Sequence, residues 1–267
     1  MSLPDILSIT AAFSYLIAAF ITVNTLFTPK GPNIVLILFL GCMAIICHAM
    51  TSTSHLMFST HMLNFSLPNV VSLVSLIITL SISAVALKYK VNLLLPVVYS
   101  FAGFWQLVLF FIPEGHENPI ISDQISVISH VSLSLIAYCV LVIATLYAFQ
   151  VSYINYKLKN KNLTAVSHLP PLMQVEGQLF MLLAMGTLCL TLSLLIGFIF
   201  LDHFFSVKNA HKTIFSFLAL IAYFVILWGH FKRGWRGHRV LIFTITATFL
   251  LTLAYFGSRF VKEFILQ

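Results

Sequence analysis

The chain has 267 residues, of which 60% are hydrophobic and only 8% are charged. Soluble domains usually carry about 25% charged residues, so the composition indicates an integral membrane protein and leaves no room for a soluble domain. The formal net charge of +7 reflects the distribution of lysine and arginine between loops, described below, and does not indicate a nucleic-acid partner.

Eight apolar runs are long enough to cross a bilayer, which takes about 20 helical residues. We expect spans at about 5–27, 34–54, 69–87, 92–112, 125–149, 177–201, 213–231 and 240–261. The pattern predicts an all-α fold, a polytopic transmembrane helix bundle of about eight spans that forms a single integral membrane domain over residues 1–267. The first span has no basic leader and no suitably placed cleavage site, so we expect it to remain as an anchor.

Most basic residues fall on alternate loops. These residues are Lys30, Lys88, Lys90, Lys157, Lys159, Lys161, Lys232, Arg233, Arg236 and Arg239. The positive-inside rule places these loops in the cytoplasm, which predicts that both termini lie outside. Only one acidic residue, Glu176, is expected on the inner side. The longest connector, at about 153–176, is basic and is expected to link two halves of the chain.

Motifs of common enzyme classes are missing from the sequence. It has no phosphate-binding glycine loop, GxSxG elbow, HExxH motif or pair of carboxylates within a span. The four cysteines all lie in apolar spans, where a free thiol behaves as a small hydrophobic side chain, so neither a disulfide framework nor a redox pair is indicated. We therefore expect a binding or assembly factor without catalytic residues of its own.

Three of the ten histidines, His48, His130 and His230, lie in otherwise apolar spans. An ionisable side chain inside a membrane is costly, so each of them is a hypothesis of function. A neutral imidazole is a good ligand for haem iron. A histidine that is hydrogen-bonded to a neighbouring helix is an open alternative for His48, and a histidine favourably placed at a helix C-terminus is one for His230. The residues alone leave haem as one option among several.

Polar residues accompany two of these histidines at helical spacing. Ser52 follows His48 by four residues and Ser134 follows His130 by four residues, so each pair lies on one face of its helix. A small-solute or ion transporter could use such a face. The lack of carboxylates embedded in the membrane argues against proton coupling.

Four segments match a known family in order and spacing. They are 64–69 (NFSLPN), 129–138 (SHVSLSLIAY), 227–237 (LWGHFKRGWRG) and 253–261 (LAYFGSRFV). Together they resemble the integral-membrane cytochrome c assembly family, the CcsA/CcmC-like haem-handling proteins, and most closely its small YpjD/HemX-type branch of the bacterial inner membrane. The turn GWRG after a histidine-ended helix is the most specific part of the match.

This resemblance implies that the protein holds or passes haem b non-covalently in the bacterial cytoplasmic (inner) membrane. By the family pattern, His130 would be an axial ligand on the outer side and His230 one within the membrane. At 1.5 Å per residue, His48 and His130 lie ~9 Å and ~7 Å below the outer surface, whereas His230 lies ~25 Å below it. We therefore expect His48 to be a third candidate ligand that pairs with His130, and His230 to need another partner.

Two parts of the family pattern are missing. The tryptophan-rich outer loop with its W-x-W-D core has no counterpart at 202–212, and the second outer histidine expected after the last span is not found before Gln267. A complete cytochrome c synthetase is therefore not expected. The alternative is a haem-biosynthesis regulator or membrane-complex scaffold that has lost the haem site. Expected partners are the lipid bilayer, haem and another membrane protein of a haem or cytochrome pathway.

Overall fold

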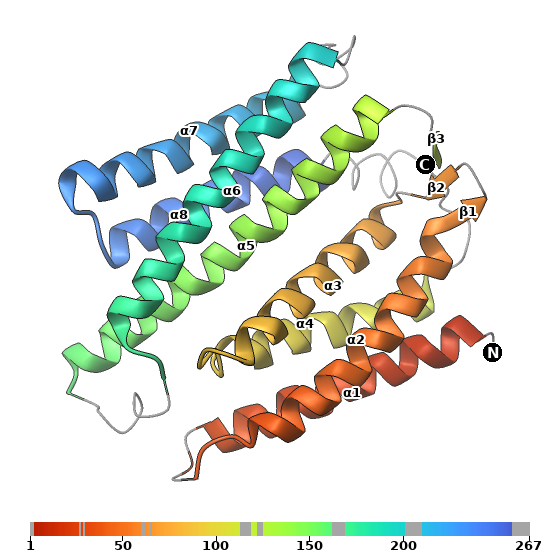
Figure 1. Ribbon diagram of the computed structural model, residues 1–267, viewed down its shortest axis with the longest axis horizontal. Coiled ribbons are helices and arrows are strands. Elements are labelled where there is room, and N and C mark those ends of the chain that lie inside the picture. The colour runs from red at the N-terminus through yellow and green to blue at the C-terminus, as the bar shows by residue number, and fades with distance from the viewer. Residues whose placement is uncertain are drawn as a thin grey trace. The chain divides into compact units, whose positions relative to one another are not determined.

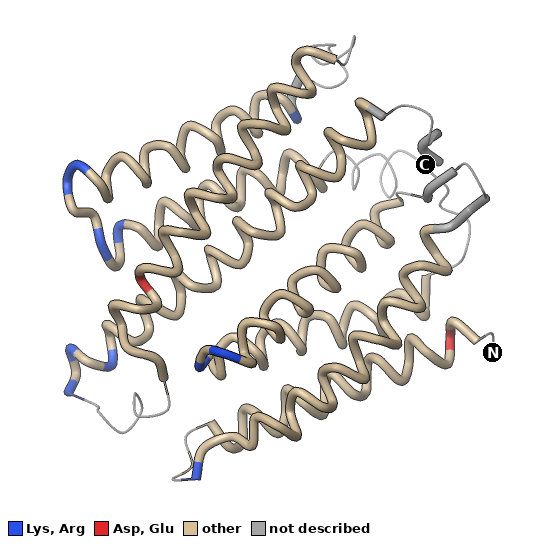
Figure 2. Tube along the Cα trace, viewed as in Figure 1, with Lys and Arg blue, Asp and Glu red and all other residues tan. Residues whose placement is uncertain are grey.

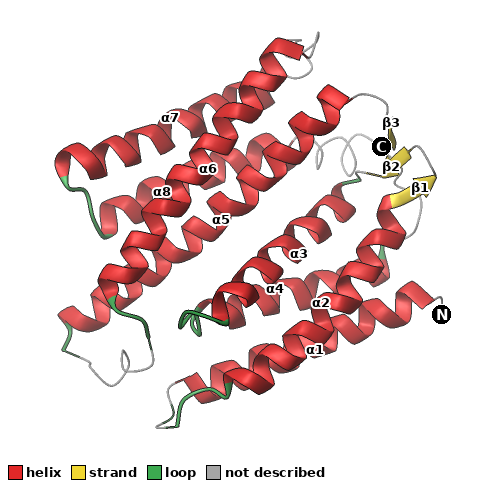
Figure 3. Cartoon of the chain, viewed as in Figure 1, coloured by secondary structure: helices red, strands yellow, loops and turns green. Residues whose placement is uncertain are grey.

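The structure, a computed structural model, consists of eight α-helices and three short strands within the residues that it describes (Figures 1 and 3). The described residues are 3–26, 28, 30–59, 62–64, 66–112, 119–121, 125–161, 169–200 and 210–257. The helices are α1 (Leu3–Leu26), α2 (Ile34–Leu56), α3 (Leu67–Ala86), α4 (Leu94–Phe111), α5 (Ile125–Lys159), α6 (Leu172–Phe200), α7 (Ala210–Arg233) and α8 (His238–Thr252), which continues into the π-helix η2 (Leu253–Gly257). All eight are long and apolar enough to cross a membrane. The predicted all-α fold of about eight spans is confirmed.

A small antiparallel sheet lies in the connections between helices. It consists of β1 (Met57–Ser59), β2 (Met62–Asn64) and β3 (Pro119–Ile121), in that order. In the pairing of β2 with β3, Leu63 lies opposite Ile120. The sheet joins the α2–α3 connection to the segment that precedes α5. This sheet was not predicted from the sequence.

The chain divides into two compact units of four helices each. The first comprises Met1–Ser122 with Lys157–Pro170, and the second comprises Asp123–Tyr156 with Pro171–Gln267. The connector at about 153–176 was expected to link two halves, but it joins α5 to α6, and both helices, apart from the end of α5 at 157–159, belong to the second unit. Helix α5 also runs ten residues beyond its predicted end at about 149. Its last turn carries lysines, which are favourable at a helix C-terminus.

Small residues allow the helices of the first unit to approach closely. Helix α1 packs against both α2 and α4. Its buried alanines are Ala11, Ala12, Ala18 and Ala19. Gly103 of α4 lies against Leu16 and the backbone carbonyl of Ala12, where a Cβ atom would collide. Close approach through small residues is the usual way in which helices associate in lipid, where no hydrophobic force drives them together. On the opposite face of α1, Phe20 is exposed and would contact lipid.

Basic residues gather at one end of the helices in each unit (Figure 2). In the first unit, Lys30 lies in the α1–α2 connection and Lys88 and Lys90 in the α3–α4 connection. The last turn of α5 carries Lys157 and Lys159. In the second unit, Lys232, Arg233, Arg236 and Arg239 lie around the turn between α7 and α8, whereas Lys212 lies near the start of α7. This distribution is the one from which the sequence analysis placed the termini outside, and the sidedness itself stays a prediction.

Candidate functional site

His48 lies in the interior of the first unit and is fully buried, at 0% exposure. Its Nδ1 is 3.3 Å from the hydroxyl of Tyr15 on α1, and its Nε2 is 3.0 Å from Oγ of Ser72 on α3. Both ring nitrogens are therefore engaged, each with a different helix. An iron could bind His48 only if one of these two hydrogen bonds were given up.

The hydrogen bonds of His48 belong to a larger network. Ser72 also contacts Oγ of Ser52 at 3.1 Å and accepts a hydrogen bond from Nε2 of Gln106 at 3.3 Å. On the other side, the Tyr15 hydroxyl is 3.3 Å from Oγ1 of Thr79. The network thus joins all four helices of the first unit through buried polar groups. This arrangement matches the alternative of a histidine hydrogen-bonded to neighbouring helices.

His130 lies in the first turns of α5, in the second unit. Its Nδ1 is 2.8 Å from the backbone carbonyl of Ser193 on α6. A carbonyl only accepts, so Nδ1 carries the hydrogen and the neutral ring has its lone pair on Nε2. Ser193 in turn donates from Oγ to the carbonyl of His130 at 3.2 Å. This reciprocal contact fixes the ring orientation of His130 against α6.

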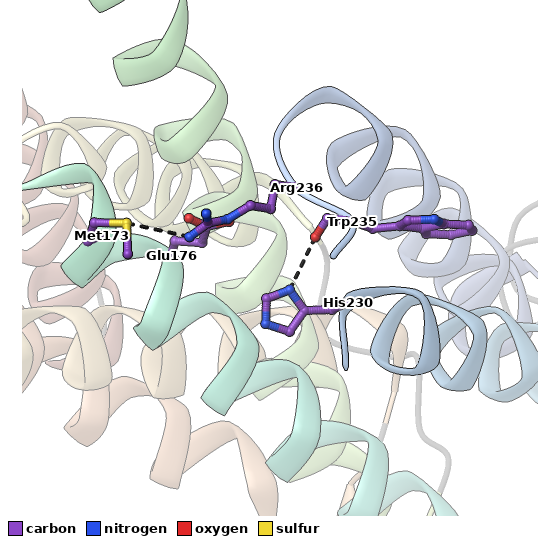
Figure 4. A network of polar contacts seen from close by, with 5 residues as sticks. All are labelled: Met173, Glu176, His230, Trp235 and Arg236. Atoms are coloured by element: carbon purple, nitrogen blue, oxygen red, sulfur yellow. Dashed lines mark hydrogen bonds and ion pairs between the residues drawn. The ribbon is translucent and has the colours of Figure 1, made fainter. Parts of the chain in front are cut away.

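His230 lies in the last turn of α7, and its ring faces Trp235 (Figure 4). Its Nδ1 donates to the backbone carbonyl of Trp235 at 3.1 Å. The imidazole stacks on the ring of Phe180 from α6, with 3.3 Å between centroids and 16° between planes. Its Nε2 has no hydrogen-bond partner among the described residues. The lone pair of His230 therefore lies on the nitrogen that no described residue engages.

The turn after α7 holds the carbonyl that orients His230. Gly234 and Gly237 have φ angles of +64° and +62°, a region in which glycine is strongly favoured. The backbone nitrogen of Trp235 donates to the carbonyl of Gly229 at 3.1 Å, and the indole lies where a Cβ on Gly229 would be. The same indole stacks on Phe243 of α8 at 5.3 Å. The geometry of this segment thus favours glycine at 229, where the indole packs, and at 234 and 237, where φ is positive.

An ion pair ties the turn to α6. Nε of Arg236 donates to Oε1 of Glu176 at 2.8 Å, and Nη2 of Arg236 is 3.4 Å from Sδ of Met173 (Figure 4). The hydrogen bond to Glu176 raises the pKa of the Arg236 guanidinium. Sequence reasoning did not identify Glu176 as part of the site. Its position as the only acidic residue expected on the inner side, close to a cluster of basic residues, was the signal that could have identified it.

His130 and His230 lie far apart within the second unit. They contact α6 at Ser193 and Phe180, thirteen residues apart, which corresponds to ~20 Å along a helix. Two axial ligands of one iron must lie much closer than this, in agreement with the depth estimate from the sequence. His48 belongs to the other unit, and its pairing with His130 stays a prediction.

The described residues contain no cluster of three or more histidine, cysteine, aspartate or glutamate side chains that could hold a metal ion by themselves. A haem iron needs only one or two axial ligands, so this finding concerns other kinds of metal site.

The two departures from the family pattern, the missing tryptophan-rich loop and the missing second outer histidine, fall largely outside the described residues, at 202–209 and after 257.

Comparisons with known proteins give matches over most of the chain. A family model described as cytochrome C assembly protein matches residues 36–266. Inner membrane protein YpjD of Escherichia coli K12 is 40% identical over 223 residues, which cover 83% of this chain and 84% of that protein. A protein of Azospirillum brasilense, described as an uncharacterized 28.8 kDa protein in the nifR3-like 5' region, is 28% identical over 140 residues, or 51% of this chain and 52% of that protein. No solved structure matches.

Proposed function

The chain belongs to the cytochrome c assembly protein family, and from this premise we propose that it holds or passes haem b through axial histidines. It is a multi-pass protein of the inner membrane, with eight helices that can span the bilayer and contact lipid. The proposal is limited to haem handling and does not include complete cytochrome c synthesis, because the tryptophan-rich loop of the family has no counterpart at 202–212.

The observation that carries the proposal is the shared hydrogen-bonding pattern of His130 and His230. Each donates from Nδ1 to a backbone carbonyl. Histidines that bind a metal almost always donate their other ring nitrogen to a carbonyl, carboxylate or water, which fixes the ring and raises the basicity of the ligand. The donor chemistry of both residues therefore fits an axial ligand of haem iron. His48 fits less well than His230, because both nitrogens of His48 are engaged.

Each of the two histidines would supply one nitrogen to a separate haem position. The ~20 Å between their contacts on α6 excludes a shared iron, so a protein that uses both would hold haem at two depths or pass it between them. The apolar helices around them exclude water from the porphyrin face. Haem itself would supply any redox chemistry, while the chain orients and binds it.

A pyridine haemochrome spectrum of the purified protein tests the proposal. We expect haem b in the wild type, partial loss of the Soret band in His130→Ala and in His230→Ala, and complete loss in the double variant. His238→Ala is a matched control, because His238 is an exposed histidine at the start of α8. A wild-type protein that stays free of haem after expression with a haem precursor would refute the proposal. A Soret band that survives in the double variant would refute the ligand assignment.

The second candidate is a regulator or scaffold of a haem or cytochrome pathway that has lost its haem site. It is favoured by the missing tryptophan-rich loop. The two candidates separate in one comparison: a haem-free protein that crosslinks to another membrane protein in native membranes supports the scaffold, whereas haem that depends on His130 and His230 supports haem handling.

A further inference from the structure

Four basic side chains lie around the turn that joins α7 to α8, within a short stretch of the chain (Figure 2). They are Lys232, Arg233, Arg236 and Arg239, and all four are exposed. The one acidic side chain that pairs with them in the described part of the chain is Glu176, which binds Arg236. Four cations and one carboxylate leave a net charge of +3 at this turn.

Three of these cations, Lys232, Arg233 and Arg239, have no carboxylate partner among the described residues. Like charges that lie close together repel one another, and an anion that binds among them relieves the repulsion. The basic turn is therefore suited to a ligand with more than one negative charge.

Trp228 holds one of the cations at the surface that faces lipid. It is 50% exposed, and the guanidinium carbon of Arg233 lies 4.7 Å from the centroid of its ring. Tryptophan side chains prefer the boundary between hydrocarbon and headgroups, and a guanidinium over the face of the ring is favourable. Arg233 is therefore held at the depth of the lipid phosphates.

An exposed apolar face of α7 leads up to these cations. Its residues recur at spacings of three and four, so they lie on one side of the helix. They are Ile214, Phe217, Ile221, Phe224, Trp228 and Phe231. Lys232 follows Trp228 by four residues and lies on the same side. The ten residues from Ile221 to Phe231 extend ~15 Å, which is half of the ~30 Å hydrocarbon core. The face thus has the length of one leaflet, with the cations at its polar end.

The turn itself keeps the cations of the two helices together. Only the four residues 234–237 separate the end of α7 from the start of α8. The indole of Trp235 stacks on Phe243 of α8, and Arg236 is tied to Glu176 of α6. A ligand between the two helix ends therefore binds to a backbone that is already ordered, which lowers the entropic cost of binding.

The charge and the apolar face together select among the lipids of a bacterial inner membrane. Phosphatidylethanolamine has no net charge, and phosphatidylglycerol carries a single phosphate. Diphosphatidylglycerol (cardiolipin) carries two phosphates joined by one glycerol, so it compensates more of the +3 charge, and basic sites between membrane helices are known to bind its headgroup. Inorganic phosphates offer the same oxygens but would leave the apolar face uncovered.

We propose that the α7–α8 turn binds the headgroup of diphosphatidylglycerol. Lys232, Arg233 and Arg239 contact the two phosphates, and an acyl chain lies along the exposed face of α7. Arg236 positions the turn through Glu176. This lipid site goes beyond the proposed haem handling and does not depend on it.

Native mass spectrometry of the full chain, titrated in detergent with tetraoleoyl cardiolipin, tests the proposal. We expect the wild type to bind one cardiolipin more tightly than dioleoylphosphatidylglycerol. In the double variant Lys232→Gln, Arg239→Gln, the affinity for cardiolipin should fall about twentyfold, since each basic residue near an anionic lipid surface contributes about fivefold. Trp228→Leu keeps an apolar side chain but removes the ring under Arg233, and should weaken binding about threefold. The unfolding temperature of the double variant should match wild type, because it changes exposed side chains only.

The matched control removes the same charge from the first unit. Lys30 and Lys90 are also exposed in connections between helices, so the double variant Lys30→Gln, Lys90→Gln should keep the cardiolipin affinity of wild type. Both double variants should keep the haem content of wild type, measured by the pyridine haemochrome spectrum, because these cations act on lipid.

Several outcomes would overturn the inference. The wild type could bind cardiolipin no more tightly than phosphatidylglycerol, or the two double variants could lose the same affinity, which would reduce the effect to overall charge. Inorganic pyrophosphate that binds as tightly as cardiolipin, and through the same residues, would assign the cations to a soluble phosphate. Loss of haem without loss of cardiolipin in Lys232→Gln, Arg239→Gln would assign them to the haem propionates.

Discussion

Replacement of His48 by leucine removes two hydrogen bonds from the buried network of the first unit. In the variant, Tyr15 keeps its contact with Thr79, and Ser72 keeps its contact with Ser52. No hydroxyl therefore loses all its partners, and the cost is that of two ordinary bonds. Interhelical hydrogen bonds in membranes contribute ~0.6 kcal/mol on average and ~1.7 kcal/mol at most. We expect the free energy of unfolding to fall by about 1–2 kcal/mol.

A double-mutant cycle with Ser72→Ala isolates the shorter of the two bonds. Reversible unfolding in mixed micelles should give a coupling of about 0.5–1 kcal/mol between positions 48 and 72. Thr10→Val is the control, because Thr10 is exposed and its hydroxyl bonds only to its own helix, so its unfolding should match wild type. The reasoning is refuted if His48→Leu keeps wild-type stability but loses haem, since His48 would then be an iron ligand.

Two further predictions follow from close contacts. Gly41→Ala places a methyl group against the Tyr99 hydroxyl and should destabilise the first unit by about 1–3 kcal/mol. Gly177 has open space around it, so Gly177→Ala should instead stabilise α6 by about 0.5–1 kcal/mol. Thermal unfolding measures both changes. Arg236→Ala leaves the carboxylate of Glu176 without its partner and should lower the unfolding temperature, and addition of Glu176→Gln should restore part of it. No recovery in the double variant would contradict a role for the ion pair.

The helices could be predicted from the sequence because the bilayer imposes a length of about 20 apolar residues on each span. Predicted and observed ends differ by a few residues for most spans. Helix α5 is the exception, because helical hydrogen bonds continue through its last ten residues, where polar and basic side chains alternate with apolar ones and the apolar signal ends. The division between α4 and α5 could not be predicted, since it depends on contacts between residues far apart in the chain.

Some features of the candidate site could be predicted from the sequence and others could not. His130 and His230 could be singled out because a histidine is rare in an apolar span. Their tautomers could not be predicted, because each depends on the position of a backbone carbonyl. For His130 this is the carbonyl of Ser193 on α6, and for His230 it is the carbonyl of Trp235 in the turn after α7. Gln150 is the first residue after the predicted span at 125–149. The lack of a hydrogen-bond partner for its buried amide could not be predicted, because it depends on how the helices pack.

The three candidate histidines differ in the kind of group that each Nδ1 meets. In His48 both nitrogens face hydroxyls, which can donate or accept, so rotation of the Tyr15 and Ser72 hydroxyls accommodates either tautomer. In His130 and His230 a carbonyl faces Nδ1, and only one tautomer of the neutral ring fits. A metal ligand requires a lone pair that stays on one nitrogen. The first unit is thus built to hold four helices together through His48, whereas the second unit fixes two imidazoles with the lone pair on Nε2.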